Sequence, residues 1–153
     1  MDKAEAIEHS PIASELRINH NKIIGRIKIM EFKVYRCNKC KKLMIEVQGS
    51  SCPTICCGQD MVLLTANTTD GATEKHVPAV TVEGNKVTAV VGSVEHPMLA
   101  EHYIQFIALE TASGVQIKYL NPGEKPCAEF LTEEKPIAVY EYCNLHGLWK
   151  TEL

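Results

Sequence analysis

Four histidines and one cysteine in the second half of the chain most constrain what it can fold into. At 143–146 the sequence Cys-Asn-Leu-His places a thiolate and an imidazole three residues apart, and His76, His96 and His102 lie upstream. One sulfur and four imidazoles exceed the four ligands of a structural zinc site, and hard cations prefer oxygen ligands. The set predicts a site with five protein ligands and a sixth position free, which suits a redox-active iron that binds a small molecule.

A second group of sulfur ligands lies in the first half of the chain. Cys37 and Cys40 form a C-x2-C pair, and the adjacent residues Cys56 and Cys57 follow. Four thiolates with this spacing can form a tetrahedral site around zinc or a single iron. Adjacent residues of an extended chain point to opposite faces, so we expect the backbone to be distorted where both ligate one metal.

Composition narrows the class of protein. The seven cysteines are an odd number and are not spaced as loop-bridging pairs, so metal ligation in a reducing cytoplasm is favoured over a disulfide framework. Sixteen basic and 19 acidic side chains give a net charge of −3, which offers no electrostatic case for binding nucleic acid or a membrane. The apolar runs are too short to span a bilayer, and no secretory signal is recognisable at the N-terminus.

Three segments are expected along the chain. Residues 1–29 carry no candidate ligand and are predicted to be an N-terminal extension, with a short helix from Ser10-Pro11 to Leu16 and otherwise flexible. Met30 is a candidate alternative start. Residues 30–65 contain the four-cysteine group, and residues 66–153 contain the histidines.

Alternating apolar and polar residues predict strands rather than helices in both later segments. In the four-cysteine segment, strands are expected around 32–35 and 43–47, and so few residues need a metal to organise them. A polar, turn-rich stretch at 65–71 is the predicted linker. Beyond it, strands are expected near 87–91, 103–109, 115–119 and 137–142, with turns at 84–85, 92–93, 113–114 and 121–123. The fold class is therefore all-β, ending in a small β-sandwich with no convincing helix.

The motifs of residues 30–153 resemble those of a known family. Glu-Lys-His-Val-Pro at 74–78, His-Pro-Met at 96–98 with His-Tyr-Ile at 102–104, and Cys-Asn-Leu-His-Gly-Leu-Trp at 143–149 are similar to the signature of superoxide reductase. The preceding C-x2-C…C-C segment resembles desulforedoxin. Together they resemble desulfoferrodoxin, the two-iron form of superoxide reductase, in which residues 1–29 have no counterpart.

This resemblance implies a fold and two iron sites. The expected fold is a small desulforedoxin-like metal domain followed by an immunoglobulin-like β-sandwich, usually as a homodimer. The first iron would be held by Cys37, Cys40, Cys56 and Cys57. The second would have one axial thiolate and four equatorial imidazoles, from Cys143, His76, His96, His102 and His146.

The resemblance also implies a reaction. Superoxide would take one electron and two protons at the ferrous second site and leave as hydrogen peroxide, without formation of dioxygen. An external donor, a rubredoxin in the family, would restore ferrous iron. Lys75 would steer superoxide and stabilise the bound product, and Glu74 would act as a reversible sixth ligand. The alternative for both is a solvated surface charge.

Several alternatives stay open from the sequence. A blue-copper carrier also has a cysteine and a histidine near the C-terminus of a β-sandwich, but four histidines exceed its needs and no methionine follows His146. A zinc-binding module would be colourless, so a visible spectrum separates these possibilities. The four-cysteine site could relay electrons or only stabilise the structure. Cys52 and Cys127 are expected to be packing residues or inert thiols, with Cys52 an alternative ligand, while His9 and His20 have no assigned role.

Overall fold

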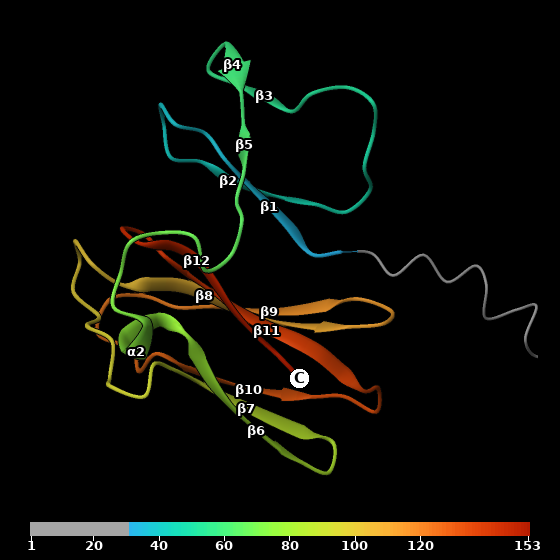
Figure 1. Cartoon of the computed structure of the whole chain (residues 1–153), viewed down its shortest axis with the longest axis vertical. Coiled ribbons are helices and arrows are strands. Elements are labelled where there is room, and N and C mark those ends of the chain that lie inside the picture. Colours follow the sequence, from blue (N-terminus) through green and yellow to red (C-terminus); the bar gives the residue numbers. More distant parts are fainter. Residues whose placement is uncertain (1–30) are drawn as a thin grey trace, which may run out of the picture.

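The computed structural model describes residues 31–153, which form a small N-terminal unit and a larger β-sandwich (Figure 1). The predicted arm at 1–29, its short helix, Met30, His9 and His20 lie outside the described residues. One sheet of the sandwich has the order β10-β7-β6, from β6 (Pro78–Glu83), β7 (Lys86–Val91) and β10 (Cys127–Leu131). The other has the order β12-β11-β8-β9, from β8 (Ile104–Thr111), β9 (Val115–Tyr119), β11 (Pro136–Cys143) and β12 (Gly147–Glu152). All neighbouring strands in these sheets are antiparallel.

The small unit, which we call the small domain, consists of five short strands. A three-stranded sheet of order β2-β1-β5 is formed by β1 (Lys33–Arg36), β2 (Leu43–Glu46) and β5 (Val62–Leu63). A separate hairpin of β3 (Ile55–Cys56) and β4 (Gln59–Asp60) lies beyond it (Figure 1). Such short strands bury little apolar surface by themselves.

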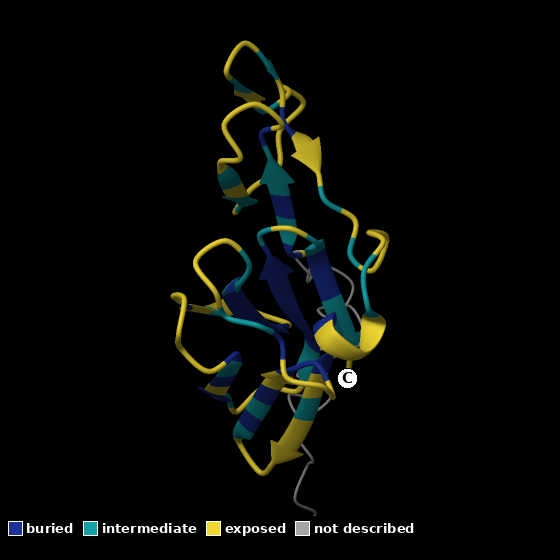
Figure 2. Ribbon diagram, turned by 90° about the vertical axis from the view of Figure 1, so that its left-hand side faces the viewer, coloured by how far each residue is buried: buried dark blue, intermediate teal, exposed yellow. Residues whose placement is uncertain are grey.

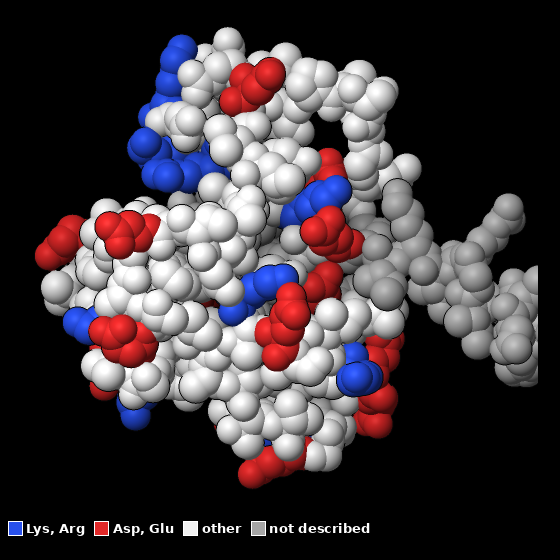
Figure 3. Space-filling model, in the orientation of Figure 1, with Lys and Arg blue, Asp and Glu red and all other residues white. Residues whose placement is uncertain are grey.

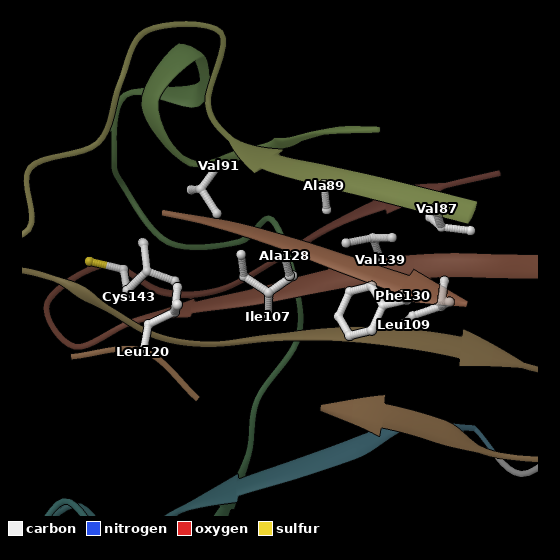
Figure 4. Close-up of a cluster of buried hydrophobic side chains, with 11 residues drawn as sticks. Val87, Ala89, Val91, Ile107, Leu109, Leu120, Ala128, Phe130, Val139 and Cys143 are labelled. Carbon is white, nitrogen blue, oxygen red and sulfur yellow. The ribbon is translucent and has the colours of Figure 1, made fainter. Parts of the chain in front are cut away.

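The interior of the sandwich is filled by side chains that alternate along its strands. On β7, Val87, Ala89 and Val91 are fully buried and face Ile107 and Leu109 of β8 across the gap between the sheets (Figure 4). The period of two places the intervening residues of β7 on the opposite face. This buried cluster also contains Cys143, so the sulfur at the end of β11 lies at the edge of the hydrophobic core (Figure 4).

A second apolar cluster joins the small domain to the sandwich. Phe32 and Val34 pack against the outer face of the four-stranded sheet, where Phe106, Tyr140 and Tyr142 are buried. The Phe32 ring meets Tyr140 edge-on at a centroid distance of 5.0 Å. Figure 2 shows the buried segment of β1 in dark blue above the sandwich, while the far end of the small domain is exposed. The small domain therefore depends on the sandwich for much of its burial.

A buried carboxylate reinforces this contact. Glu110, on β8, is 4% exposed. Its Oε1 accepts a hydrogen bond from the Phe32 backbone N–H at 3.0 Å, and its Oε2 accepts one from the Tyr140 hydroxyl at 3.0 Å. Burial and this carboxylate raise the pKa of Tyr140 above its usual range, so the phenol remains the donor. Glu110 thus links the start of β1 to two strands of the sandwich.

Replacing Glu110 with alanine should lower the free energy of unfolding by roughly 1–3 kcal/mol, because a buried N–H and a buried hydroxyl lose their acceptor. Glu110→Gln should cost less, since its amide oxygen still accepts from Phe32 and its amide NH2 can donate to Tyr140. Urea unfolding of both variants measures the difference. Glu129→Ala, which removes an exposed partner of Lys86, is the control for loss of a carboxylate alone. Equal losses in Glu110→Ala and Glu129→Ala would contradict the linking role.

The strands predicted near 87–91, 103–109, 115–119 and 137–142 are confirmed as β7, β8, β9 and β11. The expectation of no helix after the linker is wrong at α2 (Thr73–His76), whose single turn is too short to show a helical period. No strand forms in the predicted linker, but Asn67 is hydrogen-bonded through its backbone and side chain to Leu148 and Lys150 of β12. Among residues 31–153, no helix is long and apolar enough to cross a membrane.

Candidate metal centres

The predicted histidine and cysteine ligands lie at one end of the sandwich. His76 ends α2 just before β6, His96 follows the turn after β7, and His102 precedes β8. Cys143 is the last residue of β11, and His146 lies in the turn to β12. Antiparallel pairing places the start of β6 beside the end of β7 in one sheet, and the starts of β8 and β12 beside the end of β11 in the other. Packing of the two sheets against each other then brings these strand ends together, so that ring nitrogens of His76 and His146, 70 positions apart, lie within 2.9 Å of each other.

A β-bulge orients the strand that leaves His102. Tyr142 pairs with Phe106, but the next residue, Cys143, pairs with Ile104, so Gln105 has no partner in the register. The extra residue reverses the alternation of β8. Ile104 therefore joins Cys143 in the interior cluster, although Phe106 faces the small domain.

Two of the histidine rings are held in one tautomer by backbone carbonyls. His76 Nδ1 lies 2.8 Å from the Ala72 carbonyl oxygen, and His96 Nδ1 lies 2.6 Å from the Pro97 carbonyl oxygen. A carbonyl can only accept, so each Nδ1 carries a proton and each Nε2 presents a lone pair. Burial lowers the pKa of His76, and that of His96 to about 4, which keeps both rings neutral near pH 7.

These lone pairs converge on a common point. The Nε2 atoms of His96 and His76 are 3.2 Å apart, and His76 Nε2 is 2.9 Å from His146 Nδ1. The His102 Nε2 is buried and has no hydrogen-bond partner among the described residues. The four imidazole nitrogens and the Cys143 Sγ all lie within 4.8 Å of one another. Nitrogen ligands about 2.1 Å from one ion and at right angles to each other are roughly 3 Å apart, so these donors fit a shared cation.

Surrounding residues fix this group of donors further. The Trp149 ring stacks on His76 at a centroid distance of 5.0 Å and an angle of 19°. Its Nε1–H donates to the His146 carbonyl at 3.0 Å. Cys143 is fully buried, its Sγ lies 3.6 Å from His146 Nδ1, and burial raises the pKa of its thiol. A buried thiol becomes a thiolate most readily when a cation replaces its proton.

The four cysteines of the small domain form a second group. Their Sγ atoms also lie within 4.8 Å of one another, with Cys40 and Cys56 3.6 Å apart and Cys56 and Cys57 3.8 Å apart. Sulfur ligands about 2.3 Å from a tetrahedral metal ion are separated by roughly 3.8 Å. Cys57 has a φ of 53°, in the left-handed region that non-glycine residues rarely adopt. The backbone distortion expected at the adjacent pair is therefore confirmed.

The protonation of these thiols also favours a bound cation. A hydrogen bond from the Cys40 backbone N–H is the largest cause that lowers the pKa of Cys37 to about 6. The Cys40 thiol is the main partner that raises the pKa of Cys57 to about 12. Without a metal, the Cys37 thiolate is therefore stabilised while the neighbouring Cys57 keeps its proton. Lys39, in the β1–β2 turn, lies beside the four cysteines, and its Nζ donates to the Cys57 carbonyl oxygen at 3.2 Å. Figure 3 shows basic side chains gathered on this part of the small domain.

The described residues contain all seven cysteines, and none of them forms a disulfide. Cys52 is exposed and Cys127 is partly buried, and neither belongs to the two donor groups.

Residues 68–152 match the family model described as Desulfoferrodoxin, a range that contains all five donors at the end of the sandwich. The chain belongs to the desulfoferrodoxin family. The predicted fold class is confirmed: an all-β chain with a small desulforedoxin-like domain followed by an immunoglobulin-like β-sandwich.

Relatives extend this similarity over both units. The desulfoferrodoxin homolog of Archaeoglobus fulgidus is 43% identical over 119 residues, which cover 78% of this chain and 95% of that protein. The desulfoferrodoxin of Syntrophotalea carbinolica is 42% identical over 122 residues, which cover 80% and 97%. The crystal structure of the superoxide reductase from Treponema pallidum has a TM-score of 0.67 and 33% identity, covering 80% of this chain and 99% of that one.

Lys75 and Glu74, the two charged residues predicted to act beside the histidine site, differ in their position relative to the neighbouring cavity. Lys75 is exposed on α2 and lines a cavity of about 490 Å³ together with His96, Met98 and Lys125. Glu74 is also exposed but does not line this cavity. Its backbone carbonyl accepts from Val94 N at 3.0 Å, so the residue helps to hold the turn that leads to His96.

Some residues around the site were missed from the sequence. Asn144 was quoted only as part of a motif, yet its side chain bonds to the segment that carries His102. Gly92 was expected only as a turn residue, although its turn touches α2. Glu141 is fully buried two residues before Cys143, burial raises its pKa well above the usual range, and its oxygens have no partner within residues 31–153. Its alternation with Val139 and Cys143 was the available signal for its inward position.

Proposed function

We propose that the chain is a superoxide reductase, which converts superoxide to hydrogen peroxide by a one-electron, two-proton reduction without forming dioxygen. The observation that carries this proposal is the convergence of one thiol and four imidazoles at one end of the sandwich, in a member of the desulfoferrodoxin family. Relatives named superoxide reductase, including that of Treponema pallidum, support the same substrate.

The residues that would hold iron follow from the two donor groups. In the catalytic site the ligands would be His76, His96, His102, Cys143 and His146, and in the small domain Cys37, Cys40, Cys56 and Cys57. Ferrous iron bound by the four histidines and Cys143 would supply the electron. An external donor, of the rubredoxin kind in this proposal, would restore it.

The protein's own side chains would prepare the site for an anionic substrate. The carbonyls of Ala72 and Pro97 keep the protons of His76 and His96 on Nδ1, so both Nε2 atoms stay available as ligands. With ferrous iron bound, one thiolate and neutral imidazoles would leave the site with a net positive charge, and Lys75 adds a positive charge to the lining of the cavity. We assign Lys75 to attracting superoxide and Glu74 to assisting product release.

The remaining assignments are part of the same proposal. The small domain would comprise residues 30–65 and the catalytic domain residues 66–153, after an extension at 1–29. We infer a reducing, cytoplasmic setting, supported by seven cysteines without a disulfide, and a homodimer, supported by family membership alone. The four-cysteine iron would be structurally important, with a modest role in electron transfer.

The central test is metal analysis of anaerobically purified protein with optical spectra in the oxidised and reduced states. Two irons per chain, thiolate-to-iron absorption that changes on reduction, and one peroxide formed for each superoxide consumed are expected. Two zinc ions and no visible absorption would refute the proposal, as would dioxygen formed with half a peroxide per superoxide.

Replacing Lys75 with alanine should lower the second-order rate with superoxide about ten-fold, equivalent to about 1.4 kcal/mol. The iron-histidine site keeps its own positive charge, so the reaction should be slowed and not lost. Added salt should slow the parent more than the variant, because ions screen attraction beyond about a Debye length.

Pulse radiolysis at several ionic strengths measures both effects. Lys118→Ala is the matched control, because it removes the same charge from exposed β9, outside the cavity. Identical rates and salt slopes for the parent and Lys75→Ala would mean that Lys75 is a solvated surface charge that does not attract superoxide.

A further inference from the structure

Asn144 lies between the proposed ligands Cys143 and His146 in sequence, and its hydrogen bonds go to the two residues that flank a third ligand, His102. Its Oδ1 accepts from the Tyr103 backbone N–H at 3.0 Å, and its Nδ2 donates to the Glu101 carbonyl at 2.9 Å. Its own backbone N–H donates to the Tyr103 carbonyl at 3.2 Å. Three hydrogen bonds therefore hold the residues on both sides of His102, which lies between Glu101 and Tyr103.

His102 depends on its backbone for its position. The rings of His76 and His96 each donate to a carbonyl, whereas the His102 Nε2 is buried without a hydrogen-bond partner among the described residues. The His102 backbone bonds in both directions with Leu99, at 3.1 and 2.9 Å, but Leu99 belongs to the same short exposed loop. Among these hydrogen bonds, those of Asn144 are the ones that tie this loop to the strand carrying Cys143.

We propose that Asn144 is a positioning residue that sets His102 relative to Cys143, and so controls how tightly the catalytic site holds iron. This inference rests on the proposed function, whose five-ligand site it deepens. A direct effect on the sulfur is the weaker explanation, because Cys143 Sγ lies 4.0 Å from Asn144 Oδ1. Residues that orient a ligand commonly change metal affinity by about 10- to 100-fold.

The test is a double-mutant cycle on the affinity of the catalytic site for ferrous iron, measured anaerobically against a competing ferrous chelator. Asn144→Ala should lower this affinity about 10- to 100-fold. Asn144→Asp keeps the acceptor for Tyr103 but loses the donor to Glu101, so its loss should be smaller. In a His102→Ala background, adding Asn144→Ala should change the affinity by no more than about two-fold, since the ligand through which it acts is gone.

Iron in the four-cysteine site serves as an internal standard for folded, loaded protein. Asn85→Ala removes a side-chain amide bond to Glu133 at the far turn of the sandwich and should leave the affinity unchanged. At saturating iron, Asn144→Ala should shift the thiolate-to-iron band of the catalytic site in the same direction as His102→Ala does. This spectrum decides the question if the His102→Ala protein binds too weakly for the cycle.

Two results would overturn the positioning role. An unchanged affinity in Asn144→Ala would show that the three bonds do not matter for the metal. Equal losses with and without His102 would show that Asn144 acts elsewhere. A parent protein that binds iron only in the four-cysteine site would instead refute the proposed function itself, so the two failures are distinguishable.

Discussion

Cys143→Ser is expected to abolish the thiolate-to-iron absorption of the catalytic site and to reduce superoxide reduction by on the order of a hundred-fold or more, while the absorption of the four-cysteine site remains. Serine has no accessible anionic form at neutral pH, and losing a ligand should exceed the 10- to 100-fold effect of losing a residue that merely supports one. Iron content should fall from two towards one per chain.

The matched control is Cys127→Ser, which alters a partly buried cysteine outside both donor groups and should leave both absorptions intact. Cys57→Ser is the reciprocal variant. It should release or perturb the iron of the small domain, while a single turnover by chemically reduced protein largely survives. If one substitution removed both signals, the two groups of ligands would be shared or wrongly assigned.

Gly92→Ala should destabilise the protein by roughly 2–5 kcal/mol and lower iron occupancy of the catalytic site. Gly92 has a φ of 78°, and a Cβ there would lie 2.7 Å from the Lys75 carbonyl oxygen and 2.5 Å from that of Val94. The left-handed conformation costs a non-glycine residue about 1–2 kcal/mol, and overpacking adds about 1–3 kcal/mol. Relief of the clash would move α2, which ends at His76, or the turn that leads to His96.

Gly84→Ala separates these two costs. Gly84 has a similar φ of 62° in the β6–β7 turn, but a Cβ there meets nothing within 4 Å. It should therefore cost only the conformational part, about 1–2 kcal/mol, and leave iron binding unchanged. Urea unfolding and iron analysis of the two variants give the comparison. Equal losses would mean that the close approach to α2 is unimportant.

Local patterns were enough to predict the chemistry of the donors and six of the twelve strands in residues 31–153. The C-x2-C pair, the adjacent cysteines and the Cys143–His146 motif depend on short spacings, which the chain shows directly. The alternation at 115–119 predicted β9 correctly, although Ile117 is the one residue of this strand that is even partly buried. A distorted backbone at the adjacent cysteines was also expected, since two adjacent residues cannot turn to one ion on an extended chain, and Cys57 is left-handed in the structure.

The geometry of the sites was decided by tertiary structure, because it depends on residues far apart in sequence. Which nitrogen of His96 is free depends on a carbonyl one residue away, but its distance to His76 depends on the pairing of β6 with β7. Glu110 shows no local sign of its bond to Phe32, 78 residues earlier, and Asn144 shows none of its bonds to the residues flanking His102. Sequence therefore determined which side chains can bind metal, whereas strand pairing, the packing of the two sheets and the bulge at Gln105 determined where they meet.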